Sequence, residues 1–566
     1  MSLKGRIKTH GRIVAGTVVL AGAAGIATSA FATVTAQPKS GEPLKGLTAA
    51  ELSRFEIGKT LYGIPATVED GLGPIFNKAG CFSCHTSPLG GWGSITVTRF
   101  GYADKGSFDP LDDFGGSLLQ VAAIDVACQE TIPEFANVVA QRLTNASLAY
   151  GLVESIPGAD ILANADPDDL NADGISGRAH MVEAFEDPKG SPLRVGRFGW
   201  KSGIATVLTF SADAAQNEMG ITNRFLPFEN APNGDLELLA LCDTVADPED
   251  SADGEGYELI DRLTDFQRFL GPPPQTPKSG MTGEALFTQV GCNQCHTPQF
   301  TTSNDNALED AIRGRTIRVY SDFLLHNMGI LGDGIPQGDA GDLEFRTPTL
   351  WNLRTRDPML HDGRAAGGSF FDRVAGSGGA IWWHDVVGSE AQASGSAFFA
   401  LSPEDQELVV GFLDSLGRRE FDFDGNDVVN EFDFDDFKSC FGSVRVTADM
   451  SCAIGDVDQD GDVDLDDATV FFTVYTGPNG DCDGDGTSDL LAILLGAADK
   501  DGNRVPDACE QCPADLDLSG SVDGADLGEL LSAWGQCRGC AADLDLDGFV
   551  DGSDLGALLA AWGDCP

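Results

Sequence analysis

The sequence predicts a mainly α-helical protein of several domains, and three observations lead to that prediction. The chain has 566 residues, of which 42% are hydrophobic, whereas one hydrophobic core rarely grows beyond about 250–300 residues. Two Cys-x-x-Cys-His motifs each follow a helix-like lead-in, at residues 73–80 and 283–291. Beyond Arg418, short Asp/Gly loops alternate with apolar helical segments. We therefore expect two domains of similar kind, followed by a tail of small loop-and-helix units.

The first element is an N-terminal segment typical of export. Four Lys or Arg side chains and no acidic one stand in the first 12 residues, and an apolar run follows from Ile13 to about Ala32. Small residues allow cleavage after Ala32 or Ala36, so residues 1–36 are predicted to be a signal peptide. An uncleaved membrane anchor is the alternative, although a run rich in Gly and Ala is only weakly hydrophobic. No later apolar run approaches the roughly 20 residues that a membrane span needs. We expect a mature protein without a membrane span, periplasmic, secreted or at the cell surface.

The balance of charge restricts the partners of the chain. It has 88 acidic and 36 basic side chains and a formal net charge of −52. Nucleic acid and anionic membrane surfaces repel such a polyanion, so we exclude both as general partners. The charge favours cations instead, either metal ions or a basic protein.

The two Cys-x-x-Cys-His motifs predict covalent attachment of c-type haem. Two thiols three positions apart on one helical turn add to the haem vinyl groups, and the following His turns its imidazole to the iron. A redox-active cysteine pair or half of a zinc site would explain one motif, but not two that both end in His. The predicted haem-binding residues are Cys81, Cys84, His85, Cys292, Cys295 and His296.

The motifs also divide the chain into domains. Residues 41–275 are predicted to form a first cytochrome c-like haem domain, ending at the Gly-Pro-Pro-Pro breaker at 271–274. Residues 276–418 are predicted to form a second one, closing with a helix-like stretch from Pro403 to Leu416. Two covalent haems imply electron transfer and, where one iron has an open sixth position, peroxide chemistry.

The segments around these motifs resemble the di-haem oxidoreductase family, which is related to bacterial di-haem cytochrome c peroxidases. The resemblance covers residues from about 50 to 418. Its matching segments are 70–77, 173–178, 197–201, 218–222, 320–329, 345–351 and 360–365. It implies an enzyme that reduces hydrogen peroxide with electrons relayed between two haems. A small cytochrome or a cupredoxin-like protein would deliver these electrons.

The resemblance also implies roles for particular residues. Glu218, in a Glu-Met pair, corresponds to the acidic group above the peroxide-binding iron and is the expected general acid–base. Trp200 corresponds to a tryptophan that assists electron transfer between the haems. His384 lies where the relatives have Met or Tyr as sixth ligand of the second haem, and His/His ligation would lower its potential. The sixth position of the first haem has no candidate. The other candidates for the second haem are His326, Met219 and Met328.

Three other functions stay open from the sequence. The protein is either a pure electron carrier with both irons six-coordinate, or an enzyme that oxidises tryptophan on a partner protein, as some di-haem relatives do. The third possibility is that the tail carries the main function and that residues 41–418 do not contribute to it.

The tail, residues 419–566, contains a repeated acidic loop that fits calcium. Oxygen ligands stand at positions 1, 3, 5, 9 and 12, and Gly at position 6 allows the sharp turn. A weaker copy occupies 422–433, motifs at 481–489 and 499–507 resemble thrombospondin type-3 repeats, and 169–174 is a further acidic loop. The predicted calcium ligands are Asp456, Asp458, Asp460, Asp464, Asp467, Asp515, Asp517, Ser519, Asp523, Asp526, Asp543, Asp545, Asp547, Asp551 and Asp554.

Asp at position 12 and a single following helix make these loops resemble dockerin repeats rather than paired EF-hands. The unit that begins at Cys512 recurs from Cys540. We expect bound Ca²⁺ to fold these units, and the tail to serve docking or surface retention. Ten cysteines outside the motifs allow five disulfides. Spacing and elimination suggest Cys512–Cys537, Cys540–Cys565, Cys440–Cys452, Cys482–Cys509 and Cys128–Cys242.

Overall fold

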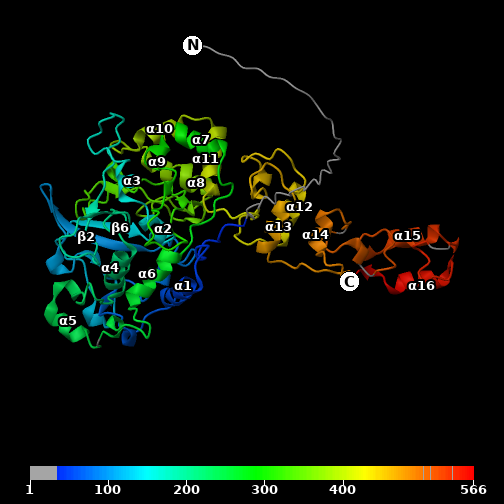
Figure 1. Ribbon diagram of the computed structural model, residues 1–566, viewed down its shortest axis with the longest axis horizontal. Helices are drawn as coiled ribbons and strands as arrows, with labels where there is room; N and C mark the ends of the chain where they lie inside the picture. Colours follow the sequence, from blue (N-terminus) through cyan, green and yellow to red (C-terminus); the bar gives the residue numbers. More distant parts are fainter. Residues whose placement is uncertain (1–34, 246, 501, 510–511, 538–539, 566) are drawn as a thin grey trace, which may run out of the picture. The chain divides into compact units, whose positions relative to one another are not determined.

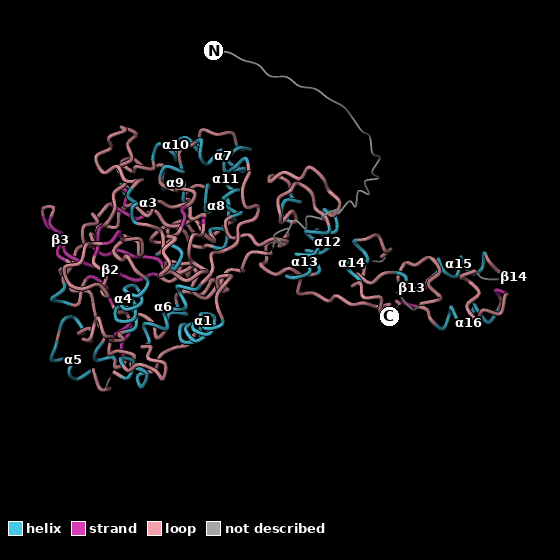
Figure 2. Tube along the Cα trace, in the orientation of Figure 1, coloured by secondary structure: helices cyan, strands magenta, loops and turns pink. Residues whose placement is uncertain are grey.

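The computed structural model describes residues 35–566 except 246, 501, 510–511, 538–539 and 566. The predicted signal peptide therefore falls almost wholly outside the described residues. Figure 1 follows the chain in sequence colours, and Figure 2 shows that loops outweigh regular elements in residues 41–418, here called the haem region. Within the described ranges, no helix is long and apolar enough to cross a bilayer.

Three helices form the framework around the first motif. Helix α1 (Ala49–Tyr62) crosses α6 (Leu259–Phe269), and α4 (Val207–Met219) packs on α6 as well. The crossing of α1 and α6 is so close that a Cβ on Gly58 would lie 2.2 Å from the carbonyl oxygen of Arg262. A residue without a side chain is therefore required at this point of contact.

An antiparallel sheet lies beside these helices. Strand β2 (Thr96–Asp104) pairs with β3 (Ser107–Asp109), β4 (Ser117–Leu119) and β6 (Val138–Leu143). The prediction of a mainly α-helical fold holds only in part, since 33% of the described structure is helical and sheets are present as well. The physical reason is local, because β2 is rich in β-branched and aromatic residues, which favour strands.

Most of the other elements of the haem region are short. Its remaining helices are α2 (Tyr150–Glu154), α3 (Gly158–Leu162), α5 (Leu236–Cys242), α8 (Phe370–Ala375), α9 (Ala380–His384), α10 (Gln392–Phe399) and α11 (Pro403–Ser415). Its remaining strands are β5 (Ala122–Ala123), β7 (Met181–Val182), β8 (Arg194–Val195), β9 (Phe300–Thr301), β10 (Thr316–Ile317), β11 (Leu325–Asn327) and β12 (Glu344–Arg346). The helix predicted from Pro403 is confirmed as α11.

Each Cys-x-x-Cys-His motif begins with a single 3₁₀ turn, Cys81–Ser83 or Cys292–Gln294. The lead-in to the second motif is helix α7 (Thr282–Gln289), as predicted. The lead-in to the first is not a helix. It contains β1 (Ile75–Phe76), preceded by Pro74, which removes a backbone donor and disfavours a helix.

Two buried clusters make up most of the haem-region core. One joins residues from both sides of the breaker at 271–274, for example Phe266 with Phe323 and Trp351. The other lies between α7 and α11 and contains Phe287 and Phe412, whose ring centroids are 5.4 Å apart. The parts before and after the breaker therefore share buried apolar surface, which holds the two motifs in one body.

The tail forms two further clusters of its own. The first gathers the phenylalanines of α12 (Glu431–Cys440) and α13 (Leu465–Val474) with Leu490 and Ile493 of α14 (Asp489–Leu494). The second is small and lies between the last two repeats. Its elements are β13 (Ser521–Val522), α15 (Gly524–Ser532), β14 (Gly535–Gln536), β15 (Phe549–Val550), α16 (Gly552–Ala560) and β16 (Gly563–Asp564).

The disulfides confirm three expected pairs, Cys128–Cys242, Cys440–Cys452 and Cys482–Cys509. The expected closure of each last repeat on itself is wrong, because the pairs are Cys512–Cys565 and Cys537–Cys540. The strands explain this exchange. β13 pairs with β16, and β14 with β15, so the loop of each repeat bonds to the segment that follows the helix of the other.

Candidate haem pockets and metal-binding loops

Each haem motif lines a pocket of its own in the haem region. Cys81, Cys84 and His85 line the first pocket, and Cys292, Cys295 and His296 line the second. These four cysteines are free, whereas the ten others form disulfides. Thiols left unpaired in a disulfide-rich chain, next to a histidine in an apolar pocket, fit covalent attachment of haem.

Both motif histidines have the hydrogen bonding of an iron ligand. Nδ1 of His85 donates to the carbonyl oxygen of Gly91 at 3.2 Å, and Nδ1 of His296 donates to that of Tyr320 at 2.8 Å. A carbonyl partner at Nδ1 leaves Nε2 with its lone pair for a metal. Burial lowers the pKa of each imidazole to about 4, which keeps it in the neutral, ligating form at ordinary pH.

Glu218 lies in the first pocket, where the sequence predicts the acid–base group. It stands near the end of α4, and its Oε2 accepts a hydrogen bond from Asn77 Nδ2 at 2.8 Å. Burial raises the pKa of Glu218, against the Asn77 bond and the charge of Arg99, while Asp213 adds to the increase. A carboxyl group that holds its proton to higher pH is suited to giving and taking protons.

Other charged groups line the same pocket as Glu218, among them Arg99, Arg142 and Lys201. Arg142 and Lys201 both pair with Asp333, at 2.7 and 3.3 Å, and all three side chains are buried. Burial lowers the pKa of Lys201 to about 8 and that of Arg99 to about 10. The sequence analysis missed these cations, because a single sequence does not show that an arginine or lysine is buried.

Trp200 lies between the two pockets and lines both of them. Its indole Nε1 donates to the carbonyl oxygen of Leu143 at 2.7 Å, and its ring is perpendicular to those of Phe345 and His361. Phe345 and His361 stack at 4.0 Å on the side of the second pocket. Trp200 thus stands where the two pockets meet.

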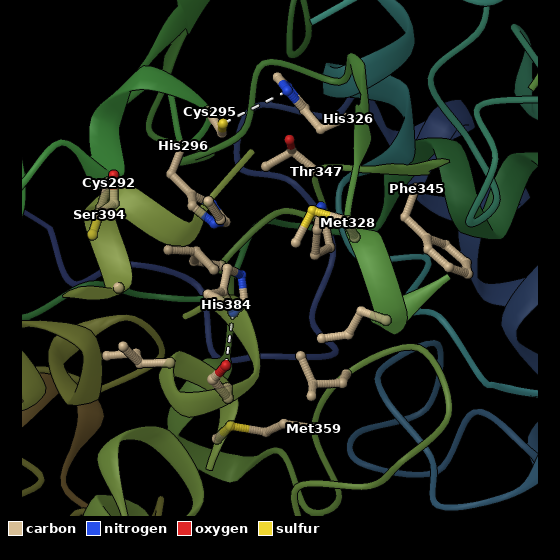
Figure 3. A pocket seen from close by; sticks show the side chains of 18 of the residues that line it. Cys292, Cys295, His296, His326, Met328, Phe345, Thr347, Met359, His384 and Ser394 are labelled. Carbon is tan, nitrogen blue, oxygen red and sulfur yellow. Dashed lines mark hydrogen bonds between the residues drawn. The ribbon is translucent and has the colours of Figure 1, made fainter. Parts of the chain in front are cut away.

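His384 faces His296 across the second pocket (Figure 3). It stands at the end of α9, and its Nδ1 donates to the carbonyl oxygen of Ala380 at 2.7 Å. Burial lowers the pKa of His384, so this imidazole is also neutral with Nε2 free. The second pocket therefore contains two neutral imidazoles, each with its Nδ1 bonded to a carbonyl oxygen.

His326, the second choice for that position, is engaged elsewhere. Its Nε2 lies 2.9 Å from Asp322 Oδ2 and its Nδ1 2.8 Å from Glu390 Oε2. With both ring nitrogens bonded to carboxylates, His326 has no lone pair to offer a metal. Met328 lines the second pocket, whereas Met219 lines the first, with its sulfur 3.8 Å from Cys81 Sγ.

Two buried arginines line the second pocket without a carboxylate partner among the described residues. Arg346 and Arg356 are 6% and 4% exposed. Arg356 Nε has no hydrogen-bond partner within the part of the chain that the structure describes. Such a pocket fits a group that carries anionic substituents, as haem does with its two propionates.

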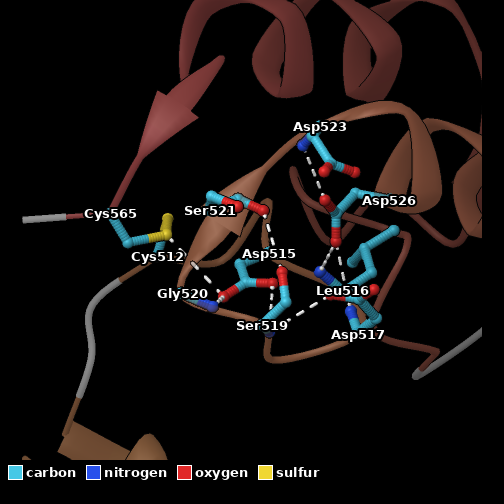
Figure 4. The surroundings of a disulfide bond; sticks show 10 residues. All are labelled: Cys512, Asp515, Leu516, Asp517, Ser519, Gly520, Ser521, Asp523, Asp526 and Cys565. Carbon is cyan, nitrogen blue, oxygen red and sulfur yellow. Dashed lines mark hydrogen bonds between the residues drawn. A yellow bond between two sulfur atoms is a disulfide. The ribbon is translucent and has the colours of Figure 1, made fainter. Parts of the chain in front are cut away.

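The acidic loops of the tail wind as a cation-binding loop does. In the loop that starts at Asp515, Oδ2 of Asp515 accepts from the backbone N–H of Gly520 at 2.8 Å (Figure 4). The equivalent bond joins Gly548 to Asp543 at 2.8 Å. In the loop from Asp456, the carboxylates at positions 1, 3 and 5 offer oxygens within 4.8 Å of one another.

Several buried carboxylate oxygens in these loops lack a hydrogen-bond partner among the described residues. They include Oδ1 of Asp456 and of Asp543, the first positions of two loops. A buried carboxylate oxygen without a partner is costly, so it points to an ion that would satisfy it. The remaining examples in the tail are oxygens of Glu420, Asp422, Asp462, Asp499 and Asp507.

The position-12 aspartates have a second role, which the sequence analysis missed. Asp526 accepts from the backbone N–H groups of Leu516, Asp517 and Asp523. Asp467 and Asp554 make the equivalent bonds. Because these carboxylates close the loop onto its helix, position 12 supports the loop before any ion binds.

Comparison with known proteins gives one family. Residues 136–416 match the model of the family described as "Di-haem oxidoreductase, putative peroxidase". The matched segment contains Trp200, Glu218, the second motif and His384, whereas the first motif precedes it. The match shows an oxidoreductase and implies haem as its cofactor. No curated protein matches the chain significantly.

Two solved structures are similar to the chain at a low level. One is a MauG-like protein associated with microbial copper homeostasis, with 15% identity over 68% of this chain and 93% of that one, and a TM-score of 0.29. The other is hydrazine synthase of Kuenenia stuttgartiensis, with 12% identity over 72% of this chain and 100% of that one, and a TM-score of 0.28. Similarities of this size carry no argument.

Proposed function

We propose, from the family match over residues 136–416 and the two pockets, that the chain is an exported di-haem c-type oxidoreductase that reduces hydrogen peroxide. In this proposal the pocket of Cys81, Cys84 and His85 is the site of peroxide reduction. The pocket of Cys292, Cys295 and His296 receives electrons and passes them on.

The difference between the pockets carries this proposal. The second pocket places His384 opposite His296, so it offers an iron two imidazoles. Among the residues that line the first pocket, His85 is the one histidine. An iron with one protein nitrogen keeps a position for a small oxygen ligand, whereas one with two imidazoles is closed to it. This asymmetry favours a peroxidase over a pure electron carrier.

Haem bound in the first pocket would supply the iron at which the oxygen–oxygen bond is reduced. The side chains of the first pocket supply proton transfer. Glu218 holds a proton that the peroxide oxygens need, and Asn77 fixes the orientation of its carboxyl group. Trp200 fills the space between the pockets with an aromatic ring, while His384 and His296 hold the second site closed.

The test is peroxide turnover by the protein loaded with both haems, with a reduced small cytochrome as electron donor. Replacement Glu218→Gln should lower kcat by a factor of about 10²–10⁴, the usual contribution of a general acid–base group. Glu130→Gln is the matched control, because Glu130 is also a buried carboxyl with a raised pKa but lines neither pocket. Equal turnover in Glu218→Gln and the unaltered protein would refute the role of Glu218. No peroxide consumption by the loaded protein would refute the function.

We also propose that the electron donor is a small basic cytochrome or a cupredoxin-like protein outside the cytoplasm. The charge of −52 supports a basic donor, and five disulfides support an oxidising compartment. Donor oxidation should slow as ionic strength rises, since salt screens such attraction. A rate that does not depend on salt would argue against electrostatic recruitment of the donor.

For the tail we propose calcium binding at the loops from Asp456, Asp515 and Asp543, with a role in docking or surface retention. The unpartnered carboxylate oxygens and the Gly at position 6 support this proposal. Equilibrium dialysis of the full chain with Ca²⁺ should give at least three bound ions, and Asp543→Asn should remove one. Asp564→Asn, in the same repeat but outside the loop, is the control. Stoichiometry that Asp543→Asn does not change would refute the assignment of that loop.

A further inference from the structure

Arg356 occupies an unusual place in the haem region. It follows the 3₁₀ turn Leu353–Thr355, and its guanidinium carbon lies 3.7 Å from the ring centroid of Trp92 and 5.6 Å from that of Trp200. Trp92 stands seven residues after His85 of the first motif. Arg356 itself lines the second pocket and not the first. Its cation is therefore stacked between two indoles at the boundary of the two sites.

Arg356 is also poorly compensated. Its NH2 donates to the carbonyl oxygen of Leu360 at 3.3 Å, and its Nε has no partner among the described residues. The neighbouring Arg346 donates to the carbonyl oxygens of Gly199 and Thr347. Carbonyl oxygens satisfy N–H groups but leave the charge in place. Burial lowers the pKa of Arg356 to about 9, with a further decrease from the charge of Arg346.

Two buried cations without an ion pair in one pocket are expensive, because the penalty for burying an unpaired charge is several kcal/mol. In the first pocket Arg142 and Lys201 share Asp333, while Arg99 forms no ion pair among the described residues but is opposed by the charges of Glu218 and Asp213. In the second pocket no described carboxylate pairs with Arg346 or Arg356. The charge of Asp322 acts on Arg346, but Asp322 is hydrogen-bonded to His326. For Arg356 a negative charge would therefore come from what the pocket holds.

We propose that Arg356, together with Arg346, is the counter-ion of the carboxylates of the haem attached at Cys292 and Cys295, and that it positions Trp200 by stacking. The proposal rests on the proposed di-haem function. It goes further by assigning two tasks to one guanidinium, neutralisation of the haem propionates and orientation of the indole between the pockets. Arg356 is thus a positioning residue, since it acts on the reaction through the haem and through Trp200.

The two tasks can be separated by two substitutions. Arg356→Gln removes both the positive charge and the guanidinium that stacks on the two indoles. Arg356→Lys keeps the charge but loses the planar face that stacks on an indole. A cation beside a haem favours the reduced form, since reduction adds an electron, so its loss lowers the potential. Arg313→Gln is the matched control, because Arg313 pairs with Asp310 outside both pockets.

The experiment is a spectroelectrochemical titration of the full chain, after the number of covalent haems has been measured by mass. We expect Arg356→Gln to shift the potential of the second haem downward and leave the first unchanged. Arg356→Lys should restore most of that potential but show the same altered near-ultraviolet tryptophan dichroism as Arg356→Gln. Arg313→Gln should match the unaltered protein in both measurements.

Each negative result would refute a different claim. Absence of the second covalent haem from the unaltered protein would refute the proposed function itself. With both haems present, unchanged potentials in Arg356→Gln, or equal shifts of both haems, would overturn the counter-ion assignment. Unchanged tryptophan dichroism in Arg356→Lys would overturn the positioning of Trp200. If Arg356→Gln does not fold, two other variants test the same claims. Arg346→Gln should lower the potential of the second haem and leave that of the first unchanged, which tests the counter-ion assignment. Arg356→Lys tests the positioning of Trp200.

Discussion

Asp467 closes the loop from Asp456, and its protonation should set the stability of that loop when calcium is removed. Burial raises the pKa of Asp467 to about 7, with backbone N–H groups of Asp464 and Val457 opposing and Asp458 and Asp456 adding to the increase. In an unfolded chain the pKa of Asp is about 3.9. The folded state therefore binds the proton more tightly, and stability falls as pH rises from about 4 to about 7.

The magnitude follows from the two pKa values. A difference of about three units corresponds to about 4 kcal/mol, at 1.36 kcal/mol per unit. Residual solvent around the loop screens this charge, so we expect about half, or about 2 kcal/mol. That free energy corresponds to a change of about 30-fold in an opening equilibrium. In the presence of Ca²⁺ the sign should reverse, because the ion binds the deprotonated carboxylate and proton and ion compete.

Hydrogen exchange measured by mass spectrometry on peptides of α13 reports the opening of this unit alone. With a chelator, the protection factor, corrected for the intrinsic pH dependence of exchange, should fall about 30-fold between pH 4 and pH 8. In Asp467→Asn this fall should disappear, whereas in Asp466→Asn, a neighbouring position on the exposed side of the helix, it should persist. A fall of equal size in Asp467→Asn, or no reversal by Ca²⁺, would refute the reasoning.

Three further predictions concern the haem region. His384→Ala should convert the second haem from six- to five-coordinate and allow carbon monoxide to bind, as absorbance spectra would show. His326→Ala should leave the second haem six-coordinate. The opposite pattern would make His326, and not His384, the sixth ligand. Trp200→Phe should slow electron transfer between the haems in stopped-flow experiments at unchanged potentials, and an unchanged rate would remove Trp200 from the path. Phe266→Ala should lower the free energy of unfolding by about 3–5 kcal/mol, because Phe266 is fully buried where α6 packs on α1. Phe228→Ala, at a 79% exposed position, should change that free energy by about 0.5 kcal/mol or less. Similar losses of unfolding free energy in the two variants would contradict the assigned core.

Chemistry encoded by short spacing was predictable from the sequence. Cys81, Cys84 and His85 lie within one turn of chain, so their association does not depend on the rest of the fold. The same holds for the acidic loops of the tail, since the carboxylates at positions 1, 3 and 5 of the loop from Asp456 lie close together. His384 required the resemblance, because only the position of its segment relative to the second motif distinguishes it from other histidines.

The rest depends on long-range contacts that a single sequence does not show. Arg346 and Arg356 look like ordinary surface arginines until the fold buries them. His326 looked like a candidate ligand because nothing local shows that Asp322 and Glu390 take both its nitrogens. Residues of β2 pair with β6 about 40 positions later, and this separation hides the sheet from patterns read over short windows.

The exchanged pairing of the last two repeats has a consequence for how such tails change in length. Because the loop strand of each repeat bonds to the end of the other, and Cys512 is tied to Cys565, neither repeat is complete alone. Deletion of one repeat from the gene would leave two strands unpaired and two cysteines without their partners. Gain or loss in steps of two repeats would keep every partner. We would expect related tails to contain such repeats in even numbers.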